Sequence, residues 1–437
     1  MKTAAIFLLS ALSLSLTAQE FNREKLNQYF DLLEQEEQAM GSVALAKNGE
    51  IIYQRQLGFA HLADSVRPNA QTQYRIGSVS KTFTAVLILK LEKEGLLKRN
   101  QKLSVYYPEI INAEKITLKM LLNHTSGIHN FTDDESYTQY LSEPKSAEKL
   151  LEIIQKGGSD FEPGSQFSYS NSNYVLLSLI AEKAGQASFA ELLRKKVIEP
   201  AQLEHTQVGK AINHKQNQAL SYQWGNGYEP ASETHMSIPL GGGNLISTPS
   251  DLCRFFYQLR GGKILDQATA DAMLPEMGDS YGLGILSFPF EGRVAYGHTG
   301  GIDGFNSMAG HFKEEGLSIA YSFNGLQMDP NQIAIAMLSA YFGKDFKIPN
   351  FTSYAASAQE LNAVTGTYSS SNFPLDIKVF VENDVLKAQA TGQAAFVLKP
   401  TAPNRFEFTP ADILMQFSPE KDQLTFTQMG RKIMFKR

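Results

Sequence analysis

The feature that most constrains this chain is a serine three residues before a lysine, at the start of a long and mostly apolar helical run. In residues 74–84, Ser78 and Lys81 precede an apolar stretch that continues to Leu89. Residues three apart share one face of a helix, so a hydroxyl and an amine are predicted to lie side by side. A serine becomes a nucleophile when a base takes its proton, and a lysine of lowered pKa can be that base. The first turn of this helix, whose dipole favours developing negative charge, is therefore the predicted reaction centre.

The same serine–lysine spacing recurs at three other places, which we interpret as surface features. Each lies among Glu, Pro or Asp residues and lacks an apolar helix body that could keep an amine away from water. The three pairs are Ser142 with Lys145, Ser146 with Lys149, and Ser418 with Lys421.

Two further motifs follow in chain order. Tyr-Ser-Asn at 169–171 ends a turn-rich stretch and leads into a helical run over 174–184. His-Thr-Gly-Gly at 298–301 follows a predicted strand over 293–296. Each has a plain interpretation by itself, as a packing tyrosine and a structural histidine. Their order after the Ser78 helix favours a shared site.

Taken together, the three motifs resemble those of the serine β-lactamase and penicillin-binding-protein superfamily. The resemblance covers residues 27–342 and includes the segments 116–128 and 241–252. Within the second segment, Thr248 is predicted to cap a helix whose first residue is Pro249. The chain is most similar to the branch of class C β-lactamases and serine D-peptidases or esterases. It leans toward the peptidases and esterases because its third motif begins with His298 where many relatives carry lysine.

The resemblance implies a role for each motif. Ser78 would attack a carbonyl and form an acyl-enzyme, with the backbone N–H groups of Ser78 and Gly301 as the oxyanion hole. Gly300 and Gly301 suit this place because they lack side chains that would block a substrate carbonyl. Asn171 offers both a donor and an acceptor, which suits it to orient Lys81 and a substrate amide.

Proton transfer is assigned to Lys81 and Tyr169 together. An unperturbed lysine or tyrosine has a pKa of about 10, so neither is a ready base at neutral pH. Burial lowers the pKa of a lysine and a nearby cation lowers that of a tyrosine, so each is expected to help the other. Lys81 would take the serine proton, and Tyr169 would relay it to the leaving group and later activate water.

His298 bears on the choice of substrate. An unperturbed imidazole is mostly uncharged above about pH 6.5 and is a weak anchor for a substrate carboxylate. We therefore expect D-amino-acid amides or peptides, or small esters, as substrates. Carboxylate substrates are expected to improve as the pH falls toward about 6 and the imidazole becomes charged.

Other functions are compatible with parts of this pattern. A class C-type β-lactamase or a DD-carboxypeptidase would use the same residues. A non-catalytic relative would bind cell-wall peptide or another small ligand without turnover. An α/β-hydrolase is disfavoured because the chain lacks a Gly-x-Ser-x-Gly elbow.

Composition excludes several classes of partner and cofactor. The net charge of -5 gives no reason to expect nucleic acid or an anionic membrane, which leaves a small-molecule or peptide substrate. The eight histidines show no metal-binding spacing, so neither a metal nor another cofactor is expected. Cys253, the single cysteine, cannot pair internally and is predicted to be a small buried hydrophobe. The sequence contains no pattern that fixes an oligomeric state.

Residues 1–18 are predicted to be a signal peptide. A lysine near the start precedes an apolar stretch over 4–16, and Ala18 offers a cleavage point. An uncleaved membrane anchor is the alternative, but the apolar stretch is short for a span. We therefore expect an exported protein, periplasmic or secreted, with no integral membrane segment after cleavage.

The order of the patterns predicts an α/β (α+β) chain of two domains. Strand patterns lie at the two ends of residues 19–343: a hairpin over 41–53 with its turn at Asn48 and Gly49, and strands over 281–285, 293–296, 305–312 and 317–323. With helical patterns between them, they predict an antiparallel sheet flanked by helices with an inserted helical lobe. Residues 344–361 are predicted to be a linker. Short strands over 362–437, among them one over 385–390, predict a small antiparallel β-barrel or sheet. This tail resembles the lipocalin-like β-domain of some superfamily members. Its expected role is a structural cap, with substrate gating or a binding role as the alternatives.

Overall fold

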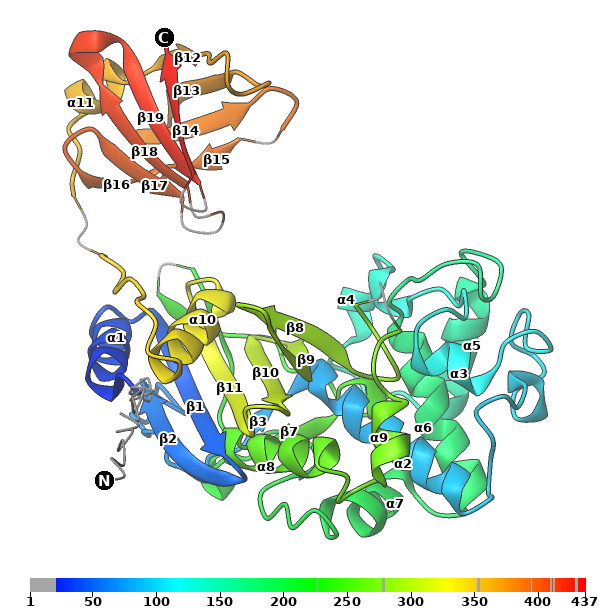
Figure 1. Cartoon of the computed structure of the whole chain (residues 1–437). Helices are drawn as coiled ribbons and strands as arrows, with labels where there is room; N and C mark the ends of the chain where they lie inside the picture. Colours follow the sequence, from blue (N-terminus) through cyan, green and yellow to red (C-terminus); the bar gives the residue numbers. More distant parts are fainter. Residues whose placement is uncertain are drawn as a thin grey trace, which may run out of the picture.

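A computed structural model describes residues 21–437 except 226, 277–279, 352–353, 394, 409–410, 412 and 429–430. The predicted signal peptide lies outside the described residues. The larger unit is built on a six-stranded antiparallel sheet with the strand order β2-β1-β11-β10-β9-β8 (Figure 1). Its strands are β1 (Ala39–Lys47), β2 (Glu50–Leu57), β8 (Leu286–Phe290), β9 (Arg293–Ile302), β10 (Phe305–Phe312) and β11 (Leu317–Leu326).

The two faces of the sheet carry different side chains along β1. Val43 and Leu45 pack in a core with α1 (Arg23–Gln35) and α10 (Pro330–Tyr341). Ala44 and Ala46 belong to a second core with α8 (Pro249–Arg260), because side chains alternate between the faces of a strand. The small alanine side chains let α8 lie close to the sheet.

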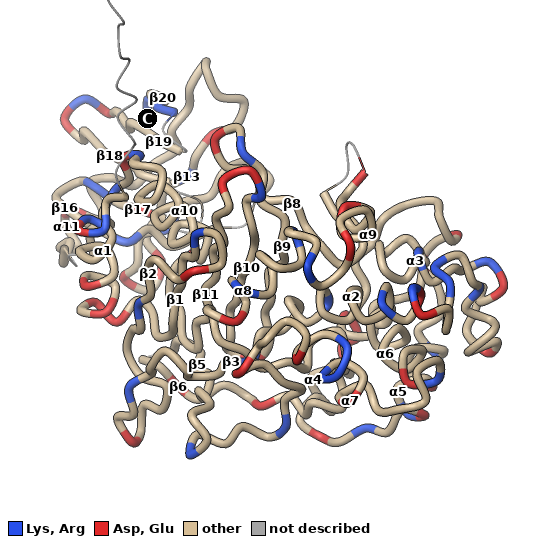
Figure 2. Tube along the Cα trace, turned by 60° about the horizontal axis from the view of Figure 1, so that its bottom comes forward, with Lys and Arg blue, Asp and Glu red and all other residues tan. Residues whose placement is uncertain are grey.

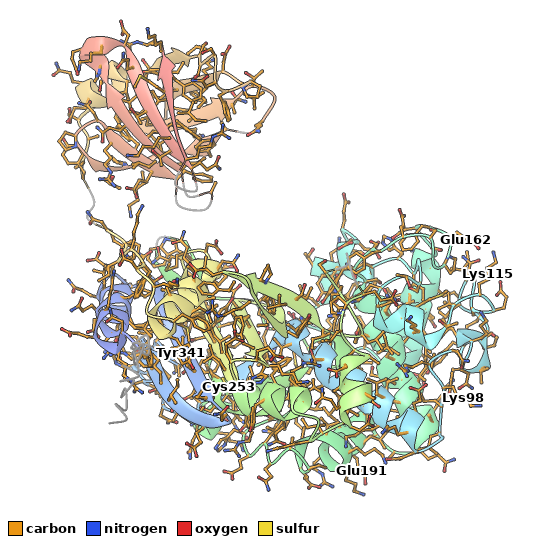
Figure 3. All side chains as sticks on the ribbon, viewed as in Figure 1. Lys98, Lys115, Glu162, Glu191, Cys253 and Tyr341 are labelled. Carbon is orange, nitrogen blue, oxygen red and sulfur yellow. The ribbon has the colours of Figure 1, made fainter. Side chains whose placement is uncertain are left out.

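Helix α8 begins as its sequence predicts. Thr248 caps it by accepting a hydrogen bond from the backbone N–H of Asp251, and Pro249 is its first residue. Cys253 lies on this helix and is buried (Figure 3), with its Sγ 3.7 Å from the carbonyl oxygen of Ala44. Burial raises the pKa of the thiol, so Cys253 is the buried hydrophobe that the sequence predicts.

The helical lobe packs around two helices that are buried on most sides. Most residues of α2 and α6 are buried in this part of the core. The lobe lies to the right of the sheet in Figure 1. Its helices are α2 (Ser80–Lys93), α3 (Leu118–Leu122), α4 (Tyr137–Tyr140), α5 (Ala147–Gly157), α6 (Asn171–Gly185) and α7 (Phe189–Leu193).

The C-terminal unit is made of two antiparallel sheets that share one core. The first has the order β12-β13-β14-β15 and the second β16-β17-β18-β19-β20. A bridge between Ser369 and Lys436 joins the start of the unit to its last strand. The strands are β12 (Gly366–Tyr368), β13 (Ile377–Glu382), β14 (Val385–Ala390), β15 (Phe396–Val397), β16 (Lys399–Ala402), β17 (Arg405–Phe408), β18 (Ile413–Ser418), β19 (Gln423–Gln428) and β20 (Arg431–Lys436).

Three local predictions differ from the structure. The strand predicted over 281–285 is a turn, in which Gly284 has φ +71 and packs against the first turn of α2. The His-Thr-Gly-Gly motif lies inside β9, which continues to Ile302, and does not follow the strand. The predicted linker 344–361 overlaps α11 (Ala358–Ala363), whose Leu361 packs in the C-terminal core.

Charged side chains of both signs alternate over the chain, as the sequence predicts. Figure 2 shows Lys and Arg interspersed with Asp and Glu in both units. Many form exposed ion pairs, such as Lys115 with Glu162 at 2.8 Å. Among the described residues, no helix has the length and apolar character needed to cross a bilayer.

Candidate active site

Ser78 lies where the last turn before α2 meets the inner strand β9. It is the middle residue of the 3-10 turn η1 (Gly77–Val79), one turn earlier than the helix itself. Gly77 has φ +48, and a Cβ there would lie 2.9 Å from the backbone nitrogen of Gly301. A Cβ on Gly300 would lie 2.1 Å from the carbonyl oxygen of Ile76 and 2.9 Å from the backbone nitrogen of Ser78. The turn and the strand can approach this closely because both carry glycine at the contact.

Lys81 lies beside Ser78, as the spacing predicts. Its Nζ is 2.8 Å from Ser78 Oγ, 2.8 Å from Asn171 Oδ1 and 2.7 Å from the carbonyl oxygen of Gly242. The side chain is fully buried. Burial holds the pKa of Lys81 well below its ordinary value. When Lys81 is neutral, its two N–H groups can be donated to Asn171 and Gly242, which leaves the lone pair for the Ser78 hydroxyl.

Asn171 is the first residue of α6 and is held from several sides. Its side-chain oxygen accepts from Lys81, and its Nδ2 donates to Thr132 Oγ1 at 2.9 Å. Its backbone N–H donates to Asn130 Oδ1 at 2.9 Å. The predicted role of orienting Lys81 therefore has a geometric basis. Thr132 takes one of the two Nδ2 N–H groups, so the role of Asn171 toward a substrate amide stays a prediction.

Tyr169 faces the same serine. Its hydroxyl interacts with Ser78, and Lys81 Nζ lies 4.9 Å from the centre of its ring. Burial raises the pKa of Tyr169, and the hydrogen bond with Ser78 opposes this only in part. The pKa of Tyr169 is therefore shifted opposite to the direction expected from a nearby cation, because burial dominates it. The geometry favours Lys81 as the base and Tyr169 as a protonated hydroxyl that donates.

His298 lies in β9 and is buried against the rings of Tyr169 and Tyr281. It is 1% exposed, its Nδ1 is 2.5 Å from the carbonyl oxygen of Thr299, and its Nε2 is 3.1 Å from the hydroxyl of Tyr281. Burial, with a contribution from Lys81, lowers the pKa of His298 to about 3. An imidazole buried in this way stays neutral at pH 6. The expected role as a carboxylate anchor that becomes charged near pH 6 is not compatible with this placement.

A pocket of about 520 Å³ opens beside Ser78. Among the described residues that line it there is no lysine, arginine or histidine. Its one charged residue, Asp303, is 2.8 Å from the buried guanidinium of Arg75 and also accepts from Thr234. Apolar walls come from both the lobe and the sheet. The lining includes Gly77, Ser78, Phe131, Thr132, Tyr137, Leu141, Asn171, Thr234, Gly242, Gly243, Gly301, Ile302, Asp303, Phe305 and Asn306.

Several residues around the site had no predicted role. Gly242 supplies a carbonyl to Lys81, and Thr132 holds Asn171. His124 and Tyr281 pack against Tyr169, with ring centres 4.3 and 6.0 Å away. Gly242 and His124 lie in two segments that carry the family resemblance, but their contacts depend on chain folding that no local pattern reports.

One group of potential metal ligands lies elsewhere in the described residues. Ligand atoms of His61, Asp64 and His214 come within 4.8 Å of one another. The two imidazoles stack with ring centres 4.5 Å apart and planes at 14°. Their lone pairs therefore lie in separate, nearly parallel planes and do not point to one shared position, as a zinc ion requires. The group does not have the geometry of a metal centre.

Comparison with known proteins identifies the family of the chain. A family model described as Beta-lactamase matches residues 28–342, which is most of the chain. The chain belongs to the Beta-lactamase family. It is a serine hydrolase of the β-lactamase fold.

Two curated relatives illustrate the range of the family. Penicillin-binding protein 4* of Bacillus subtilis (strain 168) is 25% identical over 92% of this chain and 94% of its own length. Teichoic acid D-alanine hydrolase of Staphylococcus aureus is 26% identical over 60% of this chain and 66% of its own length.

Two solved structures share the fold. A D-stereospecific amidohydrolase from Streptomyces sp. is 26% identical with a TM-score of 0.62, and the match covers 72% of this chain and 98% of that one. An octameric penicillin-binding protein homologue from Pyrococcus abyssi is 21% identical with a TM-score of 0.69. This second match covers 95% of this chain and 100% of that one, so the shared fold extends into the C-terminal unit.

Proposed function

We propose that this protein is an exported hydrolase that forms an acyl-enzyme on Ser78 and cleaves amide or ester bonds of D-amino-acid compounds. The observation that carries the proposal is the contact of 2.8 Å between Lys81 Nζ and Ser78 Oγ in a fully buried setting. A D-stereospecific amidohydrolase and a D-alanine hydrolase among the similar proteins support the substrate class. Export rests on the signal-peptide pattern in residues 1–18.

The acylation step follows from the contacts of Lys81. Neutral Lys81 takes the Ser78 hydroxyl proton while the serine oxygen forms a bond to the substrate carbonyl carbon. The carbonyl oxygen gains the negative charge and would be held by the backbone N–H groups of Ser78 and Gly301. When the intermediate collapses, the bond to the amine or alcohol breaks. Tyr169 donates its proton to that leaving group and regains one from Lys81.

Deacylation repeats these steps with water as the nucleophile. Water gives a proton to the Lys81 and Tyr169 pair as its oxygen bonds to the acyl carbon. Ser78 leaves and recovers its proton. A proton can pass between the two groups through Ser78, because both Lys81 and Tyr169 contact its side chain.

The pocket favours substrates without a free carboxylate near the scissile bond. The buried guanidinium of Arg75, next to the pocket residue Asp303, is already paired with Asp303 and Glu233. A carboxylate would have to give up its hydration without gaining a cationic partner, which is unfavourable. Amides and esters carry no such charge.

The test combines covalent labelling with a substrate panel. Treatment with a fluorophosphonate should place one adduct on Ser78, found by peptide mass spectrometry, and Ser78→Ala should abolish it. The panel holds D- and L-amino-acid amides, matched esters, a D-Ala-D-Ala peptide and a chromogenic cephalosporin. D-amino-acid amides or esters should give the highest kcat/KM. A label on another serine would contradict the mechanism, and faster turnover of the cephalosporin or the peptide would instead support a β-lactamase or DD-carboxypeptidase.

A further inference from the structure

His124 occupies an unusual place next to the site. It follows α3, is 0% exposed, and has φ +59, in the left-handed region that few non-glycine residues adopt and that histidine enters more often than most. Strained backbone of this kind persists where the surrounding contacts hold it, and it gathers at functional sites. The contacts of His124 therefore need a physical explanation.

Those contacts hold the backbone on both sides of Tyr169, at Ser168 and at Ser170. The carbonyl oxygen of His124 accepts from the backbone N–H of Ser168 at 3.0 Å. Its Nδ1 accepts from the backbone N–H of Ser170 at 3.1 Å. Between these two bonds, the imidazole lies on the ring of Tyr169, with centres 4.3 Å apart and planes at 33°. One residue thus fixes the backbone before and after Tyr169 and the plane of its ring.

The same contacts fix the tautomer of His124. Nδ1 faces the N–H of Ser170 and also the side-chain amide of Asn173 at 3.2 Å, so it is an acceptor. Asn173 is held in this orientation because its Oδ1 accepts from Ser126 Oγ at 2.6 Å. The proton of the neutral ring is therefore on Nε2. Nε2 is buried with no hydrogen-bond partner among the described residues, and the aromatic rings of Tyr169, Tyr174 and Tyr281 surround the imidazole.

His124 also stays uncharged. Burial lowers its pKa well below the ordinary value, and Lys81 and His298 lower it further. A neutral ring lets Nδ1 keep its acceptor role at every pH where the enzyme would work. A protonated ring would instead place a second donor against the N–H of Ser170.

We propose that His124 is a positioning residue that holds the hydroxyl of Tyr169 at Ser78 through its Nδ1 acceptor and its ring. The proposal rests on the proposed function, because it assumes that Tyr169 transfers a proton in turnover. His124 lies outside the substrate pocket, so it acts through Tyr169 and not on the substrate.

Two substitutions separate the two contributions of His124. His124→Phe keeps a ring against Tyr169 but removes the acceptor for Ser170. His124→Asn loses the ring but keeps an oxygen near the position of Nδ1, and asparagine tolerates a positive φ. With the best substrate of the panel, His124→Phe should lower kcat by about tenfold to a hundredfold, in the range of a misplaced catalytic group. His124→Asn should recover part of this loss, and KM should change less than threefold in both.

A double-mutant cycle with Tyr169→Phe distinguishes positioning from a general loss of structure. If His124 acts through the hydroxyl of Tyr169, the His124 substitutions should cost little more once that hydroxyl is gone. The matched control is His311→Asn, because His311 is also a buried histidine, 2% exposed, with Nδ1 bonded to Ser318. It lies on β10 away from Tyr169 and should leave kcat unchanged.

The outcomes separate this proposal from the proposed function. Multiplicative losses in the cycle, or an unchanged kcat in both His124 variants, would overturn the positioning role while Ser78 is still labelled and the unsubstituted enzyme is active. Failure to label Ser78 in the unsubstituted enzyme would instead count against the proposed function. Thermal melts of each variant show whether a loss of kcat accompanies unfolding.

Discussion

The surroundings of Ser78 and the core of the C-terminal unit are both well buried, but they bury different chemistry. The C-terminal core holds mainly apolar side chains, such as Phe406 and Phe435, on strands whose other face is more exposed. The site around Ser78 buries Lys81, His124 and a set of tyrosines. A buried donor or acceptor without a partner costs about 1–3 kcal/mol, and a buried charge costs more. Burying these polar groups around Ser78 therefore costs free energy that folding alone does not require, which is expected of a reaction site.

The largest loss of activity is expected when Lys81 is replaced, because the described part of the C-terminal core has no residue of this kind. Lys81→Ala removes the proposed base and leaves Ser78 without a proton acceptor, so kcat should fall on the order of a hundredfold or more. Lys90→Ala is the matched control, because Lys90 lies on the same helix but far from the serine, and its kcat should stay near that of the unsubstituted enzyme. Steady-state kinetics on a D-amino-acid amide measures both. Equal activity of the two variants would remove Lys81 from the chemistry.

A second prediction separates the two glycines of β9. A Cβ on Gly300 would overlap the carbonyl oxygen of Ile76 at 2.1 Å, whereas the nearest atom to a Cβ on Gly301 is 3.9 Å away. Gly300→Ala must move the strand away from the Ser78 turn, and a shift of about 1 Å can cost up to about a hundredfold in rate. Gly301→Ala should cost less. The ratio of kcat/KM for the two variants tests this, and a greater loss in Gly301→Ala would contradict the steric argument.

The pH dependence should follow Lys81 and not His298. The pKa of Lys81 is lowered by burial, and its neutral form is the base, so kcat/KM for an amide should rise with pH through the pKa of Lys81 in the folded enzyme. His298, with a pKa near 3, stays neutral from pH 6 to 8. The ratio of kcat/KM between a carboxylate substrate and its amide should therefore not increase as the pH is lowered from 8 to 6. An increase in that ratio would return His298 to substrate recognition.

The smallest effect on activity is expected in the C-terminal core. Phe406 is 1% exposed there, and Phe406→Ala should destabilise this unit by about 3–5 kcal/mol. Because Phe406 contacts none of the residues at Ser78, kcat should stay within about twofold, as is usual for sites that do not couple. Thermal melts and kinetics on the same sample compare the two effects. A large loss of kcat would show that the C-terminal unit takes part in turnover and is more than the structural cap that we propose.

The strongest predictions from the sequence concern local patterns. The hairpin through Asn48 and Gly49, the capped start of α8 and the strands β10 and β14 are all confirmed. Each depends on the period of apolar residues or on a capping residue within a few positions. The sequence pattern does not predict β18. The prediction of a strand over 281–285 is wrong, because Gly282 and Gly284 form a turn against α2 that the alternation of apolar residues does not reveal.

By itself, the sequence determined which residues could react and in what order they occur. Ser78 and Lys81 share a helix face because of their spacing, and the other two motifs follow from the family pattern. Tertiary structure decided the electrostatic states of these groups. Groups far apart in the chain decide whether the pKa of a tyrosine is lowered by a cation or raised by burial. They also decide whether His298 is exposed or buried, and which residue holds Tyr169 in place. Desolvation and close contact are properties of the packed molecule, so no local pattern could report them.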